Sequence, residues 1–119
     1  MSRILVVDDE PDQRVLLRRI FERAGHAVVD AGEGTAALRA AAESPPDLVV
    51  TDVMMPGMNG VELIRRLRAD PATAGIPILS VSGDWHLAGG ADAVVSKPYD
   101  WKDLLAVAAA LLDGRGGAR

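Results

Sequence analysis

Residues 48–60 read LVVTDVMMPGMNG, an apolar run that ends in the carboxylate Asp52 and is followed at once by a turn rich in Pro, Gly and Asn. A charged residue is seldom placed on a buried strand unless it is paired or has a function. We therefore interpret residues 48–52 as a buried strand that delivers Asp52 to one edge of a sheet. If Asp52 belongs to a site, other strands should bring polar residues to the same edge.

Strand-like and helix-like segments alternate along the whole chain. Runs of branched apolar residues predict four further strands, at residues 3–7, 27–31, 76–82 and 93–96. Apolar residues at helical spacing predict helices at residues 11–24, 35–42, 61–68 and 104–112. This alternation predicts an α/β fold, an open parallel sheet with helices on both of its faces.

The composition is that of one globular domain, because 119 residues with 49% apolar and 25% charged side chains suffice for a single core. A net charge of −4 argues against direct binding of nucleic acid, and the absence of Cys excludes thiol chemistry. No signal peptide or membrane-spanning run is evident, so we expect a cytoplasmic protein without a membrane partner. We expect the domain to cover residues 1–113, with a frayed end and residues 114–119 as a disordered tail or the start of a linker.

Polar residues close four of the five predicted strands: Asp8 and Asp9, Asp52, Ser82 and Lys97. The carboxyl ends of parallel strands form one edge, where ligands bind in such sheets. Three neighbouring carboxylates are stable only when protonated or bound to a cation, and oxygen ligands without His or Cys suit Mg²⁺ or Mn²⁺. With a cation from Lys97 and a hydroxyl from Ser82, this set predicts a phosphoryl-transfer site in which Asp52 is the nucleophile.

The chain resembles the CheY-like receiver domains of bacterial two-component response regulators over nearly its full length. Four stretches together carry the resemblance: ILVVDDE at residues 4–10, DVMMPGMNG at residues 52–60, Ser82-Gly83, and residues 90–92 leading to Lys97-Pro98. The resemblance implies a flavodoxin-like, doubly wound sheet of five parallel strands in the order 2-1-3-4-5. It also implies a cis Lys97–Pro98 bond.

The resemblance further implies that Asp52 accepts a phosphoryl group from the phosphohistidine of a sensor histidine kinase or phosphotransfer protein. It assigns Mg²⁺ binding to Asp8, Asp9, Asp52 and the backbone carbonyl of Met54, and contact with the phosphoryl group to Lys97 and Ser82. Gly57 and Gly60 would shape the turn beside this site. Such a domain is a signalling module and not an enzyme, since it catalyses only its own phosphorylation and dephosphorylation; its downstream target is not indicated.

Two features depart from the family pattern. Only residues 83–92 connect the fourth and fifth strands, near the minimum of about 10–12 residues for a crossover with its helix. We predict that the family's fourth helix is missing here or reduced to a turn around residues 84–88. Val94 occupies the position of the aromatic switch residue, and Tyr99 stands at a different position and does not substitute for it. The output face should therefore be altered.

Two other functions fit parts of the pattern. The short crossover and Val94 would suit a receiver-fold binding module that signals without phosphorylation. An Mg²⁺-dependent phosphatase with an aspartyl-phosphate intermediate would use similar chemistry. However, haloacid-dehalogenase-like enzymes carry their nucleophile in an Asp-x-Asp pattern on the first strand, whereas Asp8 and Asp9 are adjacent. Taken alone, the acidic residues 8–10 also fit a helix N-cap, and Lys97 also fits a solvated loop lysine.

Overall fold

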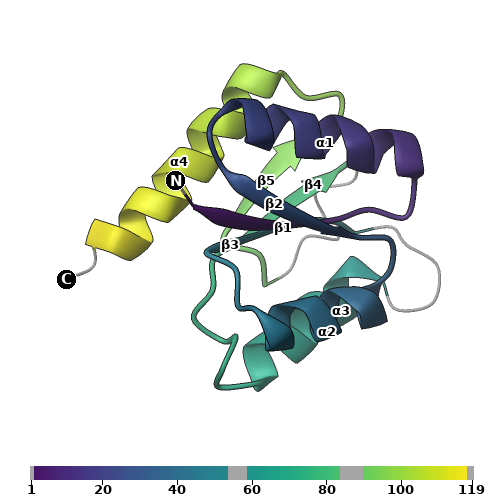
Figure 1. The fold of residues 1–119 in the computed structure, drawn as a ribbon, viewed down its shortest axis with the longest axis vertical. Coiled ribbons are helices and arrows are strands. Elements are labelled where there is room, and N and C mark those ends of the chain that lie inside the picture. The colour runs from purple at the N-terminus through teal and green to yellow at the C-terminus, as the bar shows by residue number, and fades with distance from the viewer. Residues whose placement is uncertain (1, 54–58, 84–89, 118–119) are drawn as a thin grey trace.

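A computed structural model describes residues 2–53, 59–83 and 90–117. Five parallel strands form one sheet in the order β2-β1-β3-β4-β5, which confirms the predicted doubly wound architecture (Figure 1). The strands are β1 (Arg3–Val7), β2 (Ala27–Ala31), β3 (Leu48–Asp52), β4 (Ile78–Ser82) and β5 (Ala93–Ser96). Only β4 starts later than predicted, after Pro77, which has no N–H group to donate to the ladder.

The described helices are α1 (Pro11–Arg23), α2 (Gly34–Glu43), α3 (Gly60–Ala69) and α4 (Trp101–Gly117). α1 begins with Pro11, whose fixed φ suits a first helical turn. It ends shortly before Gly25, which has a φ of 95° and so adopts the conformation that favours glycine after a helix. None of the helices in the described ranges is long and apolar enough to cross a membrane.

The helices cover both faces of the sheet, with α1 and α4 on one face and α2 and α3 on the other (Figure 1). Each face has its own apolar core, because successive residues of a strand point to opposite sides. Ile4 and Val6 of β1 pack beneath α1 and α4, whereas Leu5 and Val7 pack beneath α2 and α3. The neighbouring strand β3 is buried along its whole length. The two cores thus fix where the carboxyl ends of these strands lie.

The last helix is longer than its apolar spacing predicts. α4 starts at Trp101 and continues to Gly117, across the boundary predicted at residue 113, where we expected a frayed end. Leu104 and Ala108 are buried and anchor the helix against the sheet. The extension at the C-terminal end runs against local propensity, because residues 113–117 contain three glycines, which are poor helix formers. The linker role of the terminal residues stays a prediction.

The predicted loss of the helix between β4 and β5 falls on residues 84–89, which lie outside the described part of the chain. The described end of this connection is held by Arg68 of α3. Its guanidinium donates hydrogen bonds to the carbonyls of Ala74 and Ile76 at 2.9 Å each, to the carbonyl of Gly90 at 3.3 Å and to the carboxylate of Asp92 at 2.6 Å. One side chain therefore joins α3 to the segments before β4 and before β5.

We expect Arg68→Ala to destabilise the fold by about 2 kcal/mol, because it leaves several carbonyl groups without their donor. Urea denaturation of the two proteins would measure this difference. Arg65→Ala is the matched control, since Arg65 lies on the same helix but is exposed and, among the described residues, bonds only to Glu62. Equal denaturation midpoints for the two variants would show that Arg68 does not hold this connection.

Candidate functional site

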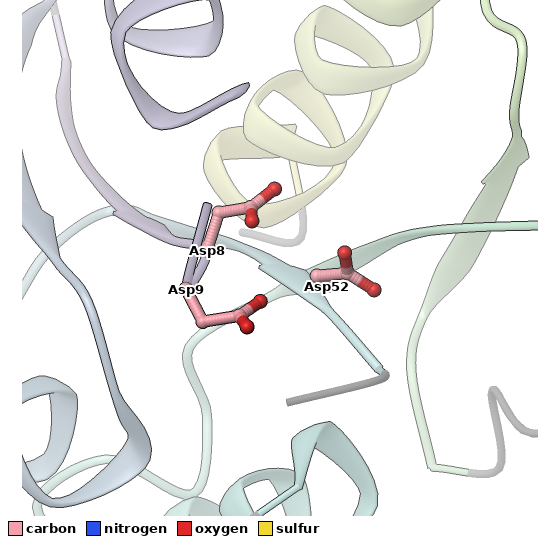
Figure 2. Close-up of side chains that lie close together, drawn as sticks. All are labelled: Asp8, Asp9 and Asp52. Carbon is pink, nitrogen blue, oxygen red and sulfur yellow. The ribbon is translucent and has the colours of Figure 1, made fainter. Parts of the chain in front are cut away.

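Three carboxylates converge at the carboxyl ends of β1 and β3. Asp8 and Asp9 follow β1, Asp52 is the last residue of β3, and these two strands are neighbours in the sheet. One oxygen from each carboxylate lies within 4.8 Å of the others, and Figure 2 shows the three side chains gathered at this edge. Asp8 is 1% exposed and Asp52 8% exposed, so the cluster is largely shielded from water.

The carboxylate of Asp8 has one satisfied oxygen and one that lacks a partner. Its Oδ1 accepts a hydrogen bond from the N–H of Glu10 at 2.9 Å, whereas Oδ2 is buried with no hydrogen-bond partner among the described residues. Burial raises the pKa of Asp8; the charge of Asp52 acts in the same direction, and the hydrogen bond from Glu10 opposes both. A buried, unpartnered carboxylate oxygen is costly unless a cation or a proton satisfies it.

The donor set of this cluster fits a hard divalent cation. Asp8, Asp9 and Asp52 offer oxygen atoms only, which Mg²⁺ and Mn²⁺ prefer. The unpartnered Oδ2 of Asp8 is an atom that such an ion would satisfy. Met54, whose backbone carbonyl was the further predicted ligand, lies outside the described residues. The part of the chain that the structure describes therefore supplies three carboxylate ligands for such an ion from two strand ends.

Lys97 reaches this cluster from the end of β5. Its Nζ donates a hydrogen bond to Oδ2 of Asp52 at 2.8 Å. Burial tends to lower the pKa of Lys97, but the hydrogen bond and the charge of Asp52 outweigh it, and the pKa is raised overall. The ammonium group is thus charged at neutral pH. The Lys97–Pro98 bond is cis, which confirms the expectation from the resemblance.

Ser82 lies at the same edge, as the last residue of β4. It is buried, and its carbonyl accepts a hydrogen bond from the N–H of Lys97 at 2.9 Å. The structure therefore brings the ends of β1, β3, β4 and β5 together, with Asp8, Asp9, Asp52, Ser82 and Lys97 at that edge.

α3 begins directly against the strand that carries Asp52. Asn59 caps the helix, since its side chain accepts a hydrogen bond from the N–H of Glu62 at 2.9 Å. The N–H of Gly60 donates to the carbonyl of Val53 at 2.8 Å. A Cβ atom at Gly60 would collide with the carbonyl oxygen of Asp52 and the Cα of Val53. Glycine is therefore required where the helix meets this strand.

We expect Gly60→Ala to destabilise the protein by about 3 kcal/mol, which is at the upper end of the effects of overpacking. The effect should be large because the new methyl group would collide with backbone atoms, which cannot move aside as a side chain can. Thermal denaturation followed by circular dichroism would measure the loss. The control is Gly75→Ala, because a Cβ atom at Gly75 has nothing within 4 Å. Similar melting temperatures for the two variants would contradict the close packing at Gly60.

Sequence reasoning missed one residue beside the cluster. Helical spacing puts Arg14 on the polar face of α1, opposite the apolar residues, but its Nη1 donates a hydrogen bond to the carbonyl of Asp8 at 2.8 Å. The available signal for this contact was the position of Arg14. It is a basic residue near the start of the helix that follows the acidic pair. Spacing alone did not show that its guanidinium turns back toward β1.

A carboxylate cluster with a paired lysine, at the ligand-binding edge of a doubly wound sheet, offers the charges that suit a cation and a phosphoryl group. Comparison with known proteins agrees. The family described as "Response regulator receiver domain" matches residues 4–109. The curated Protein PilH of Pseudomonas aeruginosa is 36% identical over 121 residues, which cover 96% of this chain and 100% of PilH.

Two further relatives show the same domain in different settings. The DNA-binding response regulator MtrA of Mycolicibacterium smegmatis is 40% identical over 112 residues, covering 88% of this chain and 48% of MtrA. The chain thus spans about half the length of MtrA. The crystallised chemotaxis protein CheY4 of Vibrio cholerae superposes with a TM-score of 0.87 at 28% identity, covering 93% of this chain and 98% of CheY4. The chain belongs to the response-regulator receiver family, the signalling modules of two-component systems.

Proposed function

We propose that the carboxylate of Asp52 accepts a phosphoryl group from a phosphohistidine on a sensor histidine kinase or a phosphotransfer protein. One observation carries this proposal: Asp52 is paired with Lys97 at 2.8 Å and at the same time lies within 4.8 Å of the Asp8 and Asp9 oxygens. The acceptor is therefore placed between a fixed cation and a set of oxygen ligands. That is the charge arrangement that phosphoryl transfer requires.

In this proposal an oxygen of Asp52 attacks the phosphorus atom, the bond to the donor imidazole nitrogen breaks, and an aspartyl phosphate forms. Lys97 would transfer its hydrogen bond from the carboxylate to a phosphoryl oxygen. Ser82, at the end of the adjacent strand β4, would supply a hydroxyl hydrogen bond to the same group. Each side chain acts by position and charge and keeps its own protons.

Asp8, Asp9 and Asp52 would hold Mg²⁺ or Mn²⁺, with the backbone carbonyl of Met54 as a further predicted ligand. When bound, the ion would neutralise negative charge on the phosphoryl oxygens. The three carboxylates repel one another without a cation, so metal binding and the approach of a phosphoryl group should favour each other.

We propose that this domain catalyses only its own phosphorylation and dephosphorylation. Its direct partner would be a histidine kinase or phosphotransfer protein, and its output partner would be another protein or a fused domain. MtrA is by name a DNA-binding regulator. For this chain, with a net charge of −4, we propose no direct contact with nucleic acid.

The proposal is tested by incubating the protein with acetyl phosphate and Mg²⁺ and separating the products on a phosphate-affinity gel. A retarded band is expected with Mg²⁺ and should disappear when EDTA is present. A protein that gives no retarded band under either condition would instead be a receiver-fold binding module that signals without phosphorylation. Steady turnover of a generic phosphate ester would favour the phosphatase alternative.

A further inference from the structure

We infer that Arg14 is a positioning residue for the metal site: it holds the main chain between Asp8 and Asp9 so that both carboxylates converge with Asp52. This inference rests on the proposed function, because it concerns the binding of Mg²⁺ by that cluster. Arg14 lies on α1, and in the described structure it does not contact the carboxylate oxygens of the Asp8, Asp9 and Asp52 cluster. Its action is on the backbone that carries them.

The peptide groups on both sides of Asp8 are fixed by hydrogen bonds. Its N–H donates to the carbonyl of Ala31, at the end of β2, at 3.1 Å. Its carbonyl accepts from Nη1 of Arg14 at 2.8 Å. That carbonyl belongs to the peptide bond joining Asp8 to Asp9, and the plane of this bond sets the direction in which both side chains leave the backbone. Arg14 therefore orients two of the three predicted carboxylate ligands with one hydrogen bond.

The guanidinium of Arg14 is itself held in place. Its Nε lies 3.6 Å from a carboxylate oxygen of Asp30 on β2, and the side chain is only 24% exposed. Gly32 leaves the space that the group occupies, because a Cβ atom there would lie 2.9 Å from Nη1. A long cationic side chain that is enclosed on several sides loses less freedom when it makes a hydrogen bond, so it can orient its partner firmly.

Arg14 contacts the main chain of Asp8 and not its carboxylate, whose Oδ2 has no hydrogen-bond partner among the described residues. Arg14 thus acts as the outer partner that fixes a ligand-bearing segment. Removing such a partner typically weakens metal binding by about 10- to 100-fold.

The matched test compares Arg14→Gln with Arg18→Gln, using the full chain and Mg²⁺ titrated by isothermal calorimetry. Both arginines lie on α1 and both pair with Asp30, but only Arg14 contacts Asp8. We expect Arg14→Gln to raise the Kd for Mg²⁺ about 10-fold. Arg18→Gln should leave the Kd within about twofold of the wild-type value, because Arg18 pairs with Glu22 and Asp30 and not with the segment that carries the ligands.

Gly32→Ala provides a second variant that keeps the charge of Arg14 but pushes its guanidinium away from the space it occupies. It should also raise the Kd for Mg²⁺, by a smaller factor. Melting temperatures measured in parallel separate positioning from stability. An Arg14→Gln variant that melts earlier but binds Mg²⁺ as the wild type does would overturn the inference, and so would equal weakening in Arg18→Gln. A wild-type chain that binds no Mg²⁺ would instead refute the proposed metal site itself.

Discussion

Asp52→Asn should abolish the incorporation of a phosphoryl group from acetyl phosphate, while the fold remains intact. The amide has nearly the shape of the carboxylate but lacks a nucleophilic oxygen that could form an acyl phosphate. Its carbonyl oxygen can still accept the hydrogen bond that Lys97 Nζ makes to Asp52 at 2.8 Å, so the local packing has no reason to change. Intact-protein mass spectrometry after incubation with Mg²⁺ would measure the loss.

The control for this experiment is Asp103→Asn, because Asp103 is an exposed carboxylate on α4, away from the cluster. It should be phosphorylated to the same extent as the wild type. Incorporation that persists in Asp52→Asn would place the acceptor on another carboxylate and refute the role of Asp52. Turnover of a phosphate ester that survives in Asp52→Asn but is lost in Asp9→Asn would identify the phosphatase alternative.

The acidic cluster was predictable because each of its members ends a run of apolar residues. Such runs predict buried strands, and in a parallel sheet the carboxyl ends of all strands lie at one edge. Asp52 and Lys97 are 45 positions apart in the chain, yet a parallel sheet brings both to the same edge. What the topology does not supply is the role of each residue, which came from the resemblance to the receiver family.

Arg14, Arg68 and the length of α4 could not be predicted in the same way. The polar side of an amphipathic helix is identified by spacing, but the reach of one arginine depends on how that helix docks against the sheet. Arg14 occupies the space beside Gly32, and Arg68 donates a hydrogen bond to the carbonyl of Gly90, 22 positions away. Contacts between residues so far apart leave no local pattern in the sequence. α4 differs because residues 113–117 contain three glycines, so that local propensity alone predicts an earlier end of the helix.

Asp8→Asn should stabilise the metal-free protein at neutral pH and remove its stabilisation by Mg²⁺. Burial, with the charge of Asp52, raises the folded-state pKa of Asp8 above its ordinary value of 3.8. The folded protein therefore binds this proton more tightly than the unfolded chain. Stability then falls as pH rises from 3.8 through the raised pKa, and at neutral pH the ionised carboxylate imposes its full cost. The amide removes that cost and can still accept the hydrogen bond from the N–H of Glu10.

Melting temperatures with EDTA and with Mg²⁺ would test both halves of this prediction. At a Mg²⁺ concentration about 100 times the Kd, the wild type should gain about 2.7 kcal/mol, and Asp8→Asn should gain almost nothing. Asp12→Asn is the control, because Asp12 is an exposed acid in the first turn of α1 and should respond to Mg²⁺ as the wild type does. The buried charge of Asp8 destabilises the metal-free protein, and the same charge favours Mg²⁺ binding. Asp8→Asn should therefore remove both effects together. An Asp8→Asn protein that melts earlier than the wild type in EDTA, or that keeps the full gain with Mg²⁺, would show that Asp8 is not a ligand held in a repulsive cluster.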